Sequence, residues 1–319
     1  MGKKIDIILL AGFLGSGKTT VLNELIRYFH GRKLGILVND FGEVPVDGAL
    51  LLNENPELLE EGHKIYEIGN GSIFCSCLKA PFVYGLKYFE EEKPDLLFIE
   101  ASGLSDPSSM NKILSDHQLA SQFSVKHVVT LIDPIRYKAL VTVLDVIGRQ
   151  ISTADQILIN KTDLIPDKEL NELIKDLKTR SSAPLQTGVF GAFDYSFIDL
   201  EVPRTLHGEL ESCNTPESRP ASLFLEGKIE SEQVLKDFMS RIEGSIYRVK
   251  GFIDIEGRSY YVSDNTVGYS LTEVVKPGMK PGLTVLCPVK HKENILQLWN
   301  EIRRIEIRPK GFSLSSPGL

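Results

Sequence analysis

The sequence predicts an α/β fold, with a mostly parallel sheet flanked by helices and a small α+β domain after it. Two observations support this prediction. Short apolar runs alternate with segments of helical period through the first 200 residues. After a proline-rich stretch, the order changes to strand, helix, strands and helix. With 42% hydrophobic residues, the chain of 319 residues has enough apolar side chains to bury a sizeable core.

Charge and cysteine content argue against several classes of protein. Lysine and arginine total 36 against 43 aspartate and glutamate, and the net charge of −7 argues against a nucleic-acid partner. No apolar run reaches the roughly 20 residues that span a bilayer, so we expect no membrane partner. Four cysteines are too few for a disulfide framework, which favours a cytoplasmic location.

A glycine-rich motif follows the first predicted strand, residues 5–11, and precedes a predicted helix at residues 21–29. It fits the phosphate-loop pattern of glycine, four residues and Gly-Lys-Thr. Backbone N–H groups at a helix N-terminus bind phosphate, and glycines let the backbone wrap around it. We expect Lys18 to reach the β- and γ-phosphates. The expected nucleotide contacts are Gly12, Gly15, Ser16, Gly17, Lys18, Thr19 and Thr20.

An acidic segment follows the second predicted strand, residues 33–39. Residues 40–48 contain acids, glycines and a proline, which is typical of a loop rather than a helix. In phosphate-loop enzymes such a segment carries acids toward Mg²⁺ and the γ-phosphate. We therefore predict functional roles for Asp40 and Glu43, with an ordinary solvated loop as the alternative.

Two thiols, Cys75 and Cys77, lie one residue apart in a loop bounded by glycine. Thiolates select soft or borderline ions such as Zn²⁺ or Cu⁺. Two thiols do not close a tetrahedral site, so other ligands or a partner must complete it. The alternative is that both cysteines pack as small apolar residues.

A third predicted strand, residues 95–100, ends in Glu100 after a helix at residues 81–92. An acid at a strand end beside a phosphate loop commonly supports Mg²⁺, so Thr19 and Glu100 are the expected magnesium residues. Gly103 follows and is placed to present its N–H to the γ-phosphate. Helix capping or ion pairing is the alternative role for Glu100.

A base-recognition motif follows the fifth predicted strand. Residues 125–133 and 155–160 are expected strands, and Asn-Lys-Thr-Asp begins at the end of the second. Asp163 can accept hydrogen bonds from guanine N1–H and its 2-amino group, a donor pair that adenine lacks. Asn160 is expected to bond the purine and neighbouring loops, and the stem of Lys161 to cover the base. The sequence therefore predicts GTP as the nucleotide.

Four parts of the chain are expected. Residues 1–200 form a phosphate-loop GTPase domain, residues 201–220 a linker, residues 221–310 a C-terminal α+β domain, and residues 311–319 a tail. The C-terminal elements expected are an apolar run at 223–225, helices at 231–242 and 292–304, and strands at 246–255, 259–262 and 282–289.

Together, the motifs resemble those of the CobW-type GTPases, relatives of the nickel-protein maturation GTPases. The resemblance includes Asp-Phe-Gly-Glu-Val from Asp40, Asn-Gly followed by cysteines, and Ile-Glu-Ala-Ser-Gly-Leu-Ser-Asp-Pro from Ile99. It continues through Asn-Lys-Thr-Asp to Tyr-Arg-Val-Lys-Gly-Phe from Tyr247, and so covers nearly the whole chain.

The resemblance implies a GTPase that delivers or inserts metal ions. It implies GTP and Mg²⁺ at the phosphate loop, and a transition metal, Zn²⁺ or Co²⁺, at the cysteine loop. We expect Lys18, Asp40, Glu100 and Gly103 to be catalytic, with Asp40 orienting the attacking water. The expected partners are a client metalloprotein or a corrinoid protein, and a homodimer is one assembly open to the chain.

The metal motif departs from the family pattern. That pattern has Cys-x-Cys-Cys after Asn-Gly. With the register kept on Asn70-Gly71 only Cys75 matches, and with a shifted register Cys75 and Cys77 match the first two cysteines and Leu78 stands at the third. Val38 stands where the family usually has an acid, and there is no histidine-rich stretch. Family metal residues therefore carry over at Glu43, Cys75 and Cys77.

Two other functions compete with this interpretation. A small-molecule kinase could use the same phosphate loop, although no arginine-rich lid is evident. A nucleotide-controlled regulatory module could act on a metalloenzyme without carrying metal itself. Comparing phosphorylation of metabolites with release of phosphate tests the first, and metal analysis with and without GTP tests the second.

Overall fold

The structure is a computed structural model that describes residues 3–39, 62–69, 73–74, 79–200, 220–265, 268–274 and 281–305. The chain divides into two compact units, Met1–Ser218 and Arg219–Leu319. Each unit has a sheet and a hydrophobic core of its own.

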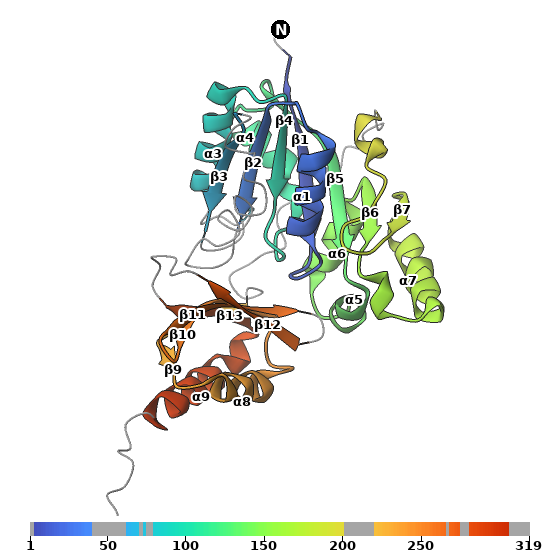
Figure 1. The fold of residues 1–319 in the computed structure, drawn as a ribbon. Helices are drawn as coiled ribbons and strands as arrows, with labels where there is room; N and C mark the ends of the chain where they lie inside the picture. The colour runs from blue at the N-terminus through green and yellow to red at the C-terminus, as the bar shows by residue number, and fades with distance from the viewer. Residues whose placement is uncertain are drawn as a thin grey trace, which may run out of the picture. The chain divides into compact units, whose positions relative to one another are not determined.

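The first unit is built on a parallel sheet of seven strands in the order β3-β2-β4-β1-β5-β6-β7 (Figure 1). All six strand pairings in it are parallel, which confirms the predicted fold class. The strands are β1 (Ile5–Gly12), β2 (Leu34–Asn39), β3 (Lys64–Ile68), β4 (Leu96–Glu100), β5 (Phe123–Ile132), β6 (Gln156–Ile159) and β7 (Leu185–Thr187).

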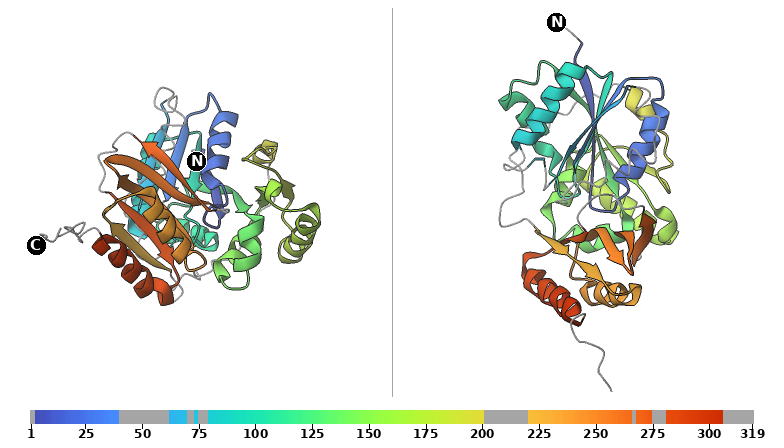
Figure 2. Two further views of the ribbon diagram at one scale, coloured as in Figure 1. Left: turned by 60° about the horizontal axis from the view of Figure 1, so that its bottom comes forward. Right: turned by 60° about the vertical axis from the view of Figure 1, so that its left-hand side comes forward.

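Helices cover both faces of this sheet (Figure 2). Successive side chains of a strand point to opposite faces. Ile7 and Leu9 of β1 therefore pack on the α3 and α4 side, while Ile8 and Leu10 pack against α1. The α-helices described in this unit are α1 (Lys18–Tyr28), α3 (Lys79–Glu92), α4 (Met110–Asp116), α5 (Pro134–Leu140), α6 (Asp145–Ser152) and α7 (Asp167–Arg180).

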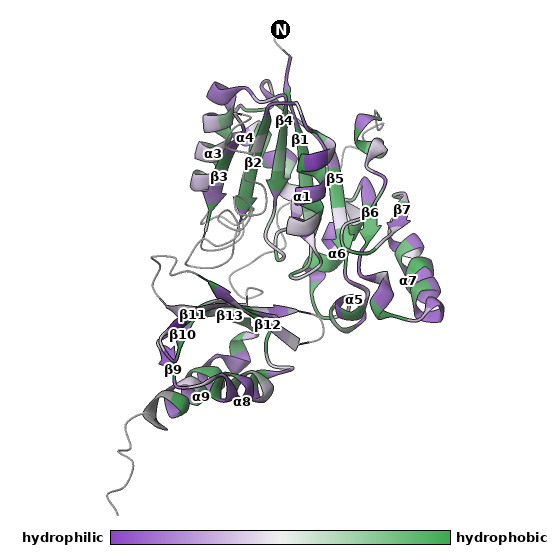
Figure 3. Cartoon of the chain, viewed as in Figure 1, coloured by the Kyte–Doolittle hydropathy of each residue, from purple (hydrophilic) through white to green (hydrophobic). Residues whose placement is uncertain are grey.

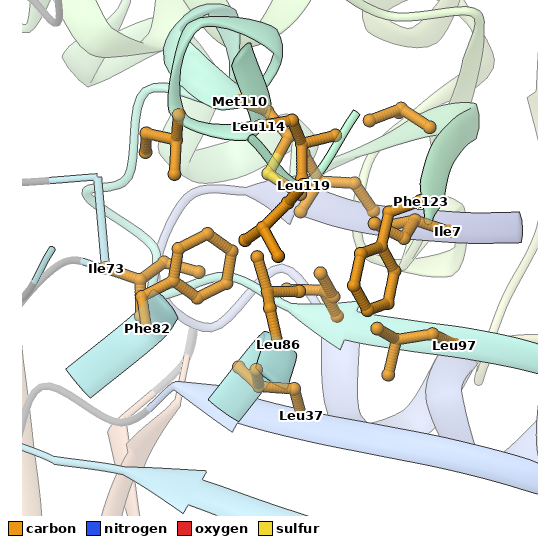
Figure 4. Close-up of a cluster of buried hydrophobic side chains, with 14 of the residues drawn as sticks. Ile7, Leu37, Ile73, Phe82, Leu86, Leu97, Met110, Leu114, Leu119 and Phe123 are labelled. Carbon is orange, nitrogen blue, oxygen red and sulfur yellow. The ribbon is translucent and has the colours of Figure 1, made fainter. Parts of the chain in front are cut away.

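The core between the sheet and α3 and α4 is aromatic and aliphatic. Figure 4 shows Phe82 and Leu86 of α3 facing Met110 and Leu114 of α4, with Phe123 at the start of β5 beside them. The central strands β1, β2 and β4 carry almost continuous apolar side chains, as the hydropathy colours in Figure 3 show. Such runs are expected for a parallel sheet that is buried on both faces.

Strand register brings the phosphate loop, Glu100 and Asn160 to the carboxyl ends of the parallel strands. Leu10 of β1 and Val38 of β2 both pair with Glu100 of β4. The phosphate loop follows β1, and Asn160 follows β6, whose Ile159 pairs with Ile132. Parallel strands bind ligands at their carboxyl ends, so this end of the sheet is the place to look for a nucleotide site.

The second unit is a mostly antiparallel sheet packed against two helices. Its strands are ordered β12-β11-β10-β13-β8, and β9 pairs with β10. Phe238 of α8 and Trp299 of α9 meet edge to face, with ring centroids 5.0 Å apart, in its core. The elements are β8 (Ala221–Glu226), β9 (Lys228–Ile229), α8 (Glu232–Ile242), β10 (Arg248–Ile255), β11 (Arg258–Asn265), β12 (Gly268–Val274), β13 (Gly282–Cys287) and α9 (Lys292–Ile305).

Several elements were not predicted from the sequence. The strands β3, β7 and β12 and the helices α4 and α6 fall in this group. The expected linker at 201–220 lies outside the described residues apart from Pro220, so that boundary stays a prediction. The expected tail also lies outside them. Among the described residues, no helix has the length and apolar character needed to cross a membrane.

Candidate nucleotide-binding site

The phosphate loop joins β1 to α1 in a conformation that requires its glycines. Gly12, Gly15 and Gly17 all have positive φ angles, at 132°, 77° and 99°. A Cβ on Gly12 would lie 2.4 Å from the Leu131 carbonyl oxygen, and one on Gly17 would lie 2.3 Å from Asn160 Nδ2. Any side chain at Gly12 or Gly17 would therefore strain the backbone and collide with a neighbouring atom.

Lys18 lies across this loop. Its ammonium donates to the carbonyl oxygens of Gly12 at 2.9 Å and Phe13 at 3.2 Å. Only 5% of the residue is exposed. Burial of an ammonium is costly unless it is hydrogen-bonded, so the loop holds a fixed positive charge beside its own amide groups. Ser16 is buried, and Thr20 is exposed in the first turn of α1.

Thr19 and Glu100 meet across 81 residues of sequence. The Thr19 hydroxyl donates to Glu100 Oε1 at 2.9 Å. Glu100 is buried at the end of β4. A hydroxyl and a carboxylate are both ligand types that Mg²⁺ prefers, so this pair fits the ion that the sequence predicted.

Gly103 lies directly against the phosphate loop. A Cβ on Gly103 would be 2.3 Å from the backbone nitrogen of Leu14. The carbonyl of Gly103 accepts a bond of 3.3 Å from Gln150 Nε2, which also donates to the Ser105 carbonyl at 2.9 Å. Gln150 of α6 thus fixes the segment after Glu100 against the loop.

The Asn-Lys-Thr-Asp segment is tied to the phosphate loop as well. Asn160 Nδ2 donates to the Ser16 carbonyl at 3.1 Å, and its Oδ1 accepts from the Gly191 N–H at 3.3 Å. Lys161 has a left-handed backbone with φ of 58°, and its ammonium donates to the Gly15 carbonyl at 2.7 Å. Asp163 is exposed. The loop, Glu100 and this segment therefore form one site.

The chain matches the model of the CobW/HypB/UreG nucleotide-binding domain over residues 6–185, which is more than half of its length. The chain belongs to the CobW/HypB/UreG family. The matched segment includes the phosphate loop, Glu100, Gly103 and the Asn-Lys-Thr-Asp motif.

Relatives of this CobW/HypB/UreG protein have names that refer to zinc. Zinc chaperone YjiA of Escherichia coli strain K12 is 27% identical, over 79% of this chain and 83% of its own. Zinc chaperone CobW of a Sinorhizobium species is 30% identical, over 83% of this chain and 86% of its own. Zinc-regulated GTPase metalloprotein activator 1 of Dictyostelium discoideum is 28% identical, over 68% of this chain and 54% of its own.

The predicted metal-cargo residues of this family member, and the predicted catalytic Asp40, remain predictions. Glu43, Cys75, Cys77 and Asp40 all lie outside the described residues. Within the described part of the chain, no group of three or more histidine, cysteine or acidic residues is arranged to hold a metal ion.

Asn39 is a site residue that the sequence analysis missed. This buried residue ends β2, and its Nδ2 donates to the Ile68 carbonyl at 3.1 Å. Its Oδ1 accepts from the N–H of Ile73 at 3.1 Å and of Ser102 at 3.2 Å. The side-chain amide of Asn39 thus joins three segments: β3, the backbone at Ile73 and the residues after Glu100. An asparagine at the end of an apolar run was the sequence signal that pointed to it.

Asp133, also missed, organises the other side of the site. It is buried after β5, and its Oδ2 pairs with the Lys161 ammonium at 3.0 Å. Its Oδ1 caps α5 by accepting from the N–H groups of Ile135 at 3.0 Å and Arg136 at 3.2 Å. The sequence signal was an acid directly before Pro134, the usual arrangement at a helix start.

Proposed function

We propose that this protein is a GTP-hydrolysing metal chaperone, or metal-insertion factor, that serves a client metalloprotein or a corrinoid pathway. Membership of the CobW/HypB/UreG family supports this proposal. The observation that carries it is the hydrogen bond between Thr19 and Glu100, because it joins the phosphate loop to the acid expected to support magnesium.

Nucleotide binding would use two parts of the site, one for the phosphates and one for the base. The N–H groups of residues 12–20 and the Lys18 ammonium would face the phosphates. Asp163 would accept from guanine, and the Lys161 stem would lie along the base. Asn160 supports both parts, since it bonds the phosphate loop and Gly191.

Thr19 and Glu100 would hold Mg²⁺. The ion would supply positive charge to the β- and γ-phosphate oxygens when bound. Gly103 would present its N–H to the γ-phosphate, since its position against Leu14 brings it to the phosphate loop. Asp40 would orient the water that attacks phosphorus, and hydrolysis would yield GDP and phosphate.

The cargo would bind through Cys75, Cys77 and Glu43. Thiolates favour zinc or cobalt over magnesium, and relatives named zinc chaperones support zinc as the first candidate. The three residues lie between the phosphate loop and Glu100 in sequence. Nucleotide state would therefore change how well the metal is held.

The proposal also covers the cellular location, the partner and the assembly of the protein. GTP as substrate and free thiols as metal ligands favour the cytoplasm. The expected partner is a client that accepts the metal, with no nucleic acid or membrane involved. A homodimer is one assembly to test by measuring mass in solution with GDP and with a GTP analogue.

Replacing both Cys75 and Cys77 by serine tests the cargo site. Serine keeps the approximate size but removes the soft ligands, so we expect stoichiometric zinc binding to be lost while GDP still binds. Zinc content after gel filtration and GDP titration calorimetry measure the two properties. Zinc still bound one to one would exclude this pair as the cargo ligands.

Cys287→Ala is the matched control for that experiment. Cys287 is a buried thiol in the second unit, and burial raises its thiol pKa, which disfavours the thiolate that binds metal. Zinc binding should therefore survive in the control. Loss of zinc in the control and not in the double variant would reverse the assignment.

A further inference from the structure

Arg136 lies on the phosphate loop, although neither the sequence motifs nor the proposed chemistry includes it. It belongs to the first turn of α5, after β5. Its Nη1 donates to the Leu14 carbonyl at 3.4 Å. Its guanidinium carbon is 3.4 Å from the position that a Cβ on Gly15 would occupy. The guanidinium therefore lies beside Gly15, at the distance of an ordinary van der Waals contact with a Cβ there.

Asp133 anchors the backbone that carries Arg136. Its carboxylate accepts the backbone N–H of Arg136 and also pairs with the ammonium of Lys161, which donates to the Gly15 carbonyl. One buried acid therefore holds the start of α5 and Lys161, and the side chains of Arg136 and Lys161 reach consecutive residues of the phosphate loop. Both partly buried cations lie beside backbone groups rather than in open solvent.

Two other residues predicted to be catalytic, Gly103 and Lys18, lie next to Leu14 and Gly15. The Leu14 nitrogen lies against Gly103, the residue predicted to face the γ-phosphate. Lys18 bonds the carbonyls of Gly12 and Phe13 just before it. A guanidinium at this point would be close to the bond between the β- and γ-phosphates.

The hydrogen bond from Arg136 Nη1 to the Leu14 carbonyl is long for an N–H donor, at 3.4 Å. Charge-assisted bonds from a guanidinium to phosphate are shorter and stronger than bonds to a carbonyl. An arginine supplied within the chain accelerates phosphoryl transfer in other phosphate-loop enzymes, because it stabilises negative charge that develops in the transition state.

We propose that Arg136 is a catalytic residue for GTP hydrolysis, supplied from α5 of the same chain. With GTP bound, the guanidinium moves from the Leu14 carbonyl to oxygens of the β- and γ-phosphates. Water forms a bond to the γ-phosphorus while the bond to the bridging oxygen breaks. GDP takes that electron pair, and the water proton passes to the released phosphate. This inference rests on the proposed GTPase function.

Arg136→Gln is the variant that tests this role. We expect kcat to fall at least about a hundredfold, because one cation of the transition state is lost. The Kd for GDP should stay within about threefold of the parent value, since GDP lacks the group being transferred. Arg136→Lys should recover part of kcat, because lysine keeps the charge and loses the planar fork. Lys138→Gln, an exposed change on the same helix, should alter neither value.

Binding of GDP with aluminium fluoride and Mg²⁺ provides a second readout. This mixture mimics the transferring phosphoryl group, so the parent should bind GDP more tightly when fluoride is added, and Arg136→Gln should lose that gain. Unchanged kcat in Arg136→Gln, or a fall in GDP affinity as large as the fall in kcat, would overturn the proposal. If the parent itself releases no phosphate from GTP, the proposed function and the role of Arg136 fail together. If the parent hydrolyses GTP and Arg136→Gln keeps both kcat and the fluoride gain, only the role of Arg136 fails.

Discussion

Glu100 shows how single contacts define the nucleotide site. It is 5% exposed, and a carboxylate so deeply buried is costly unless charges or hydrogen bonds compensate. Its bond to the Thr19 hydroxyl supplies part of that compensation. An acid and a hydroxyl held together beside a phosphate loop are suited to a divalent cation.

The residues of the site differ in how far the sequence could predict them. Lys18 and Thr19 follow from a local motif whose spacing has a physical reason. Asn39 and Asp133 act through contacts with segments far along the chain, such as Ile73 and Lys161. Such contacts depend on which strands are neighbours in the sheet, and a single sequence does not contain that order.

Asp163→Asn should shift nucleotide preference from guanine toward xanthine. The amide would donate a hydrogen bond where the carboxylate accepts one, which matches an oxo group in place of the 2-amino group. Titration calorimetry with GDP and xanthosine diphosphate measures both affinities. If the variant binds GDP as tightly as the parent does, Asp163 does not read the base.

At the level of elements, the phosphate loop and the segment after Glu100 pack directly against each other. Gly103 touches Leu14, and Gln150 of α6 holds the Gly103 carbonyl. Movement of the segment after Glu100 would therefore move the loop as well. Asn39 accepts hydrogen bonds from Ser102 and from Ile73, and Ile73 precedes Cys75 by two residues.

Gly103→Ala should disrupt the packing between the phosphate loop and the segment after Glu100. The added methyl would lie 2.3 Å from a backbone nitrogen of the loop, which cannot rotate away as a side chain can. We expect weaker GTP binding and slower phosphate release, measured by calorimetry and a phosphate assay. Parent-like values for both would show that the loop tolerates the displacement.

Gly148→Ala is the matched control. Gly148 lies inside α6, where a Cβ would meet no atom within 4 Å. Alanine favours a helix over glycine, so the variant should be about 0.5–1 kcal/mol more stable in denaturant unfolding, with unchanged hydrolysis. A loss of activity here as large as in Gly103→Ala would point to a general effect of extra methyl groups.

Elements with strong apolar runs were predictable, and weak ones were not. The runs ending at Asn39 and Glu100 lie in strands that are buried throughout, and the sequence showed both. The strand β3 is half-buried over most of its length and contains Lys64 and Glu67, so no apolar run indicated it. The three-residue strand β7 is too short for periodicity to indicate.

At the level of the whole molecule, a buried histidine links stability to pH. His127 of β5 is 1% exposed and packs edge-on against Phe197, with ring centroids 5.8 Å apart. Burial lowers the pKa of His127, and nearby Lys126 acts in the same direction, whereas Asp155 and backbone groups of Ile198 and Leu200 oppose it. The folded state therefore favours the neutral ring.

Stability should fall as pH drops below the ordinary histidine pKa of about 6.5. Below that pH the unfolded chain binds a proton at His127, whereas the folded chain keeps the ring neutral. The free energy of unfolding therefore continues to fall until the pH reaches the lowered pKa of the folded state. One such proton contributes up to about 1.4 kcal/mol per pH unit. Denaturant unfolding of the parent and His127→Leu between pH 7 and 5 measures it, with the exposed His30→Gln as control. Equal pH slopes in the parent and His127→Leu would rule out this linkage.

Control of metal binding by the nucleotide state is tested most directly by zinc affinity. Competition with a chromogenic chelator at constant pH gives the Zn²⁺ Kd of the full chain with Mg²⁺ and either GDP or a non-hydrolysable GTP analogue. The account predicts a difference of about fivefold or more between the two nucleotides, as expected for coupled sites. The same zinc affinity in both states would contradict it.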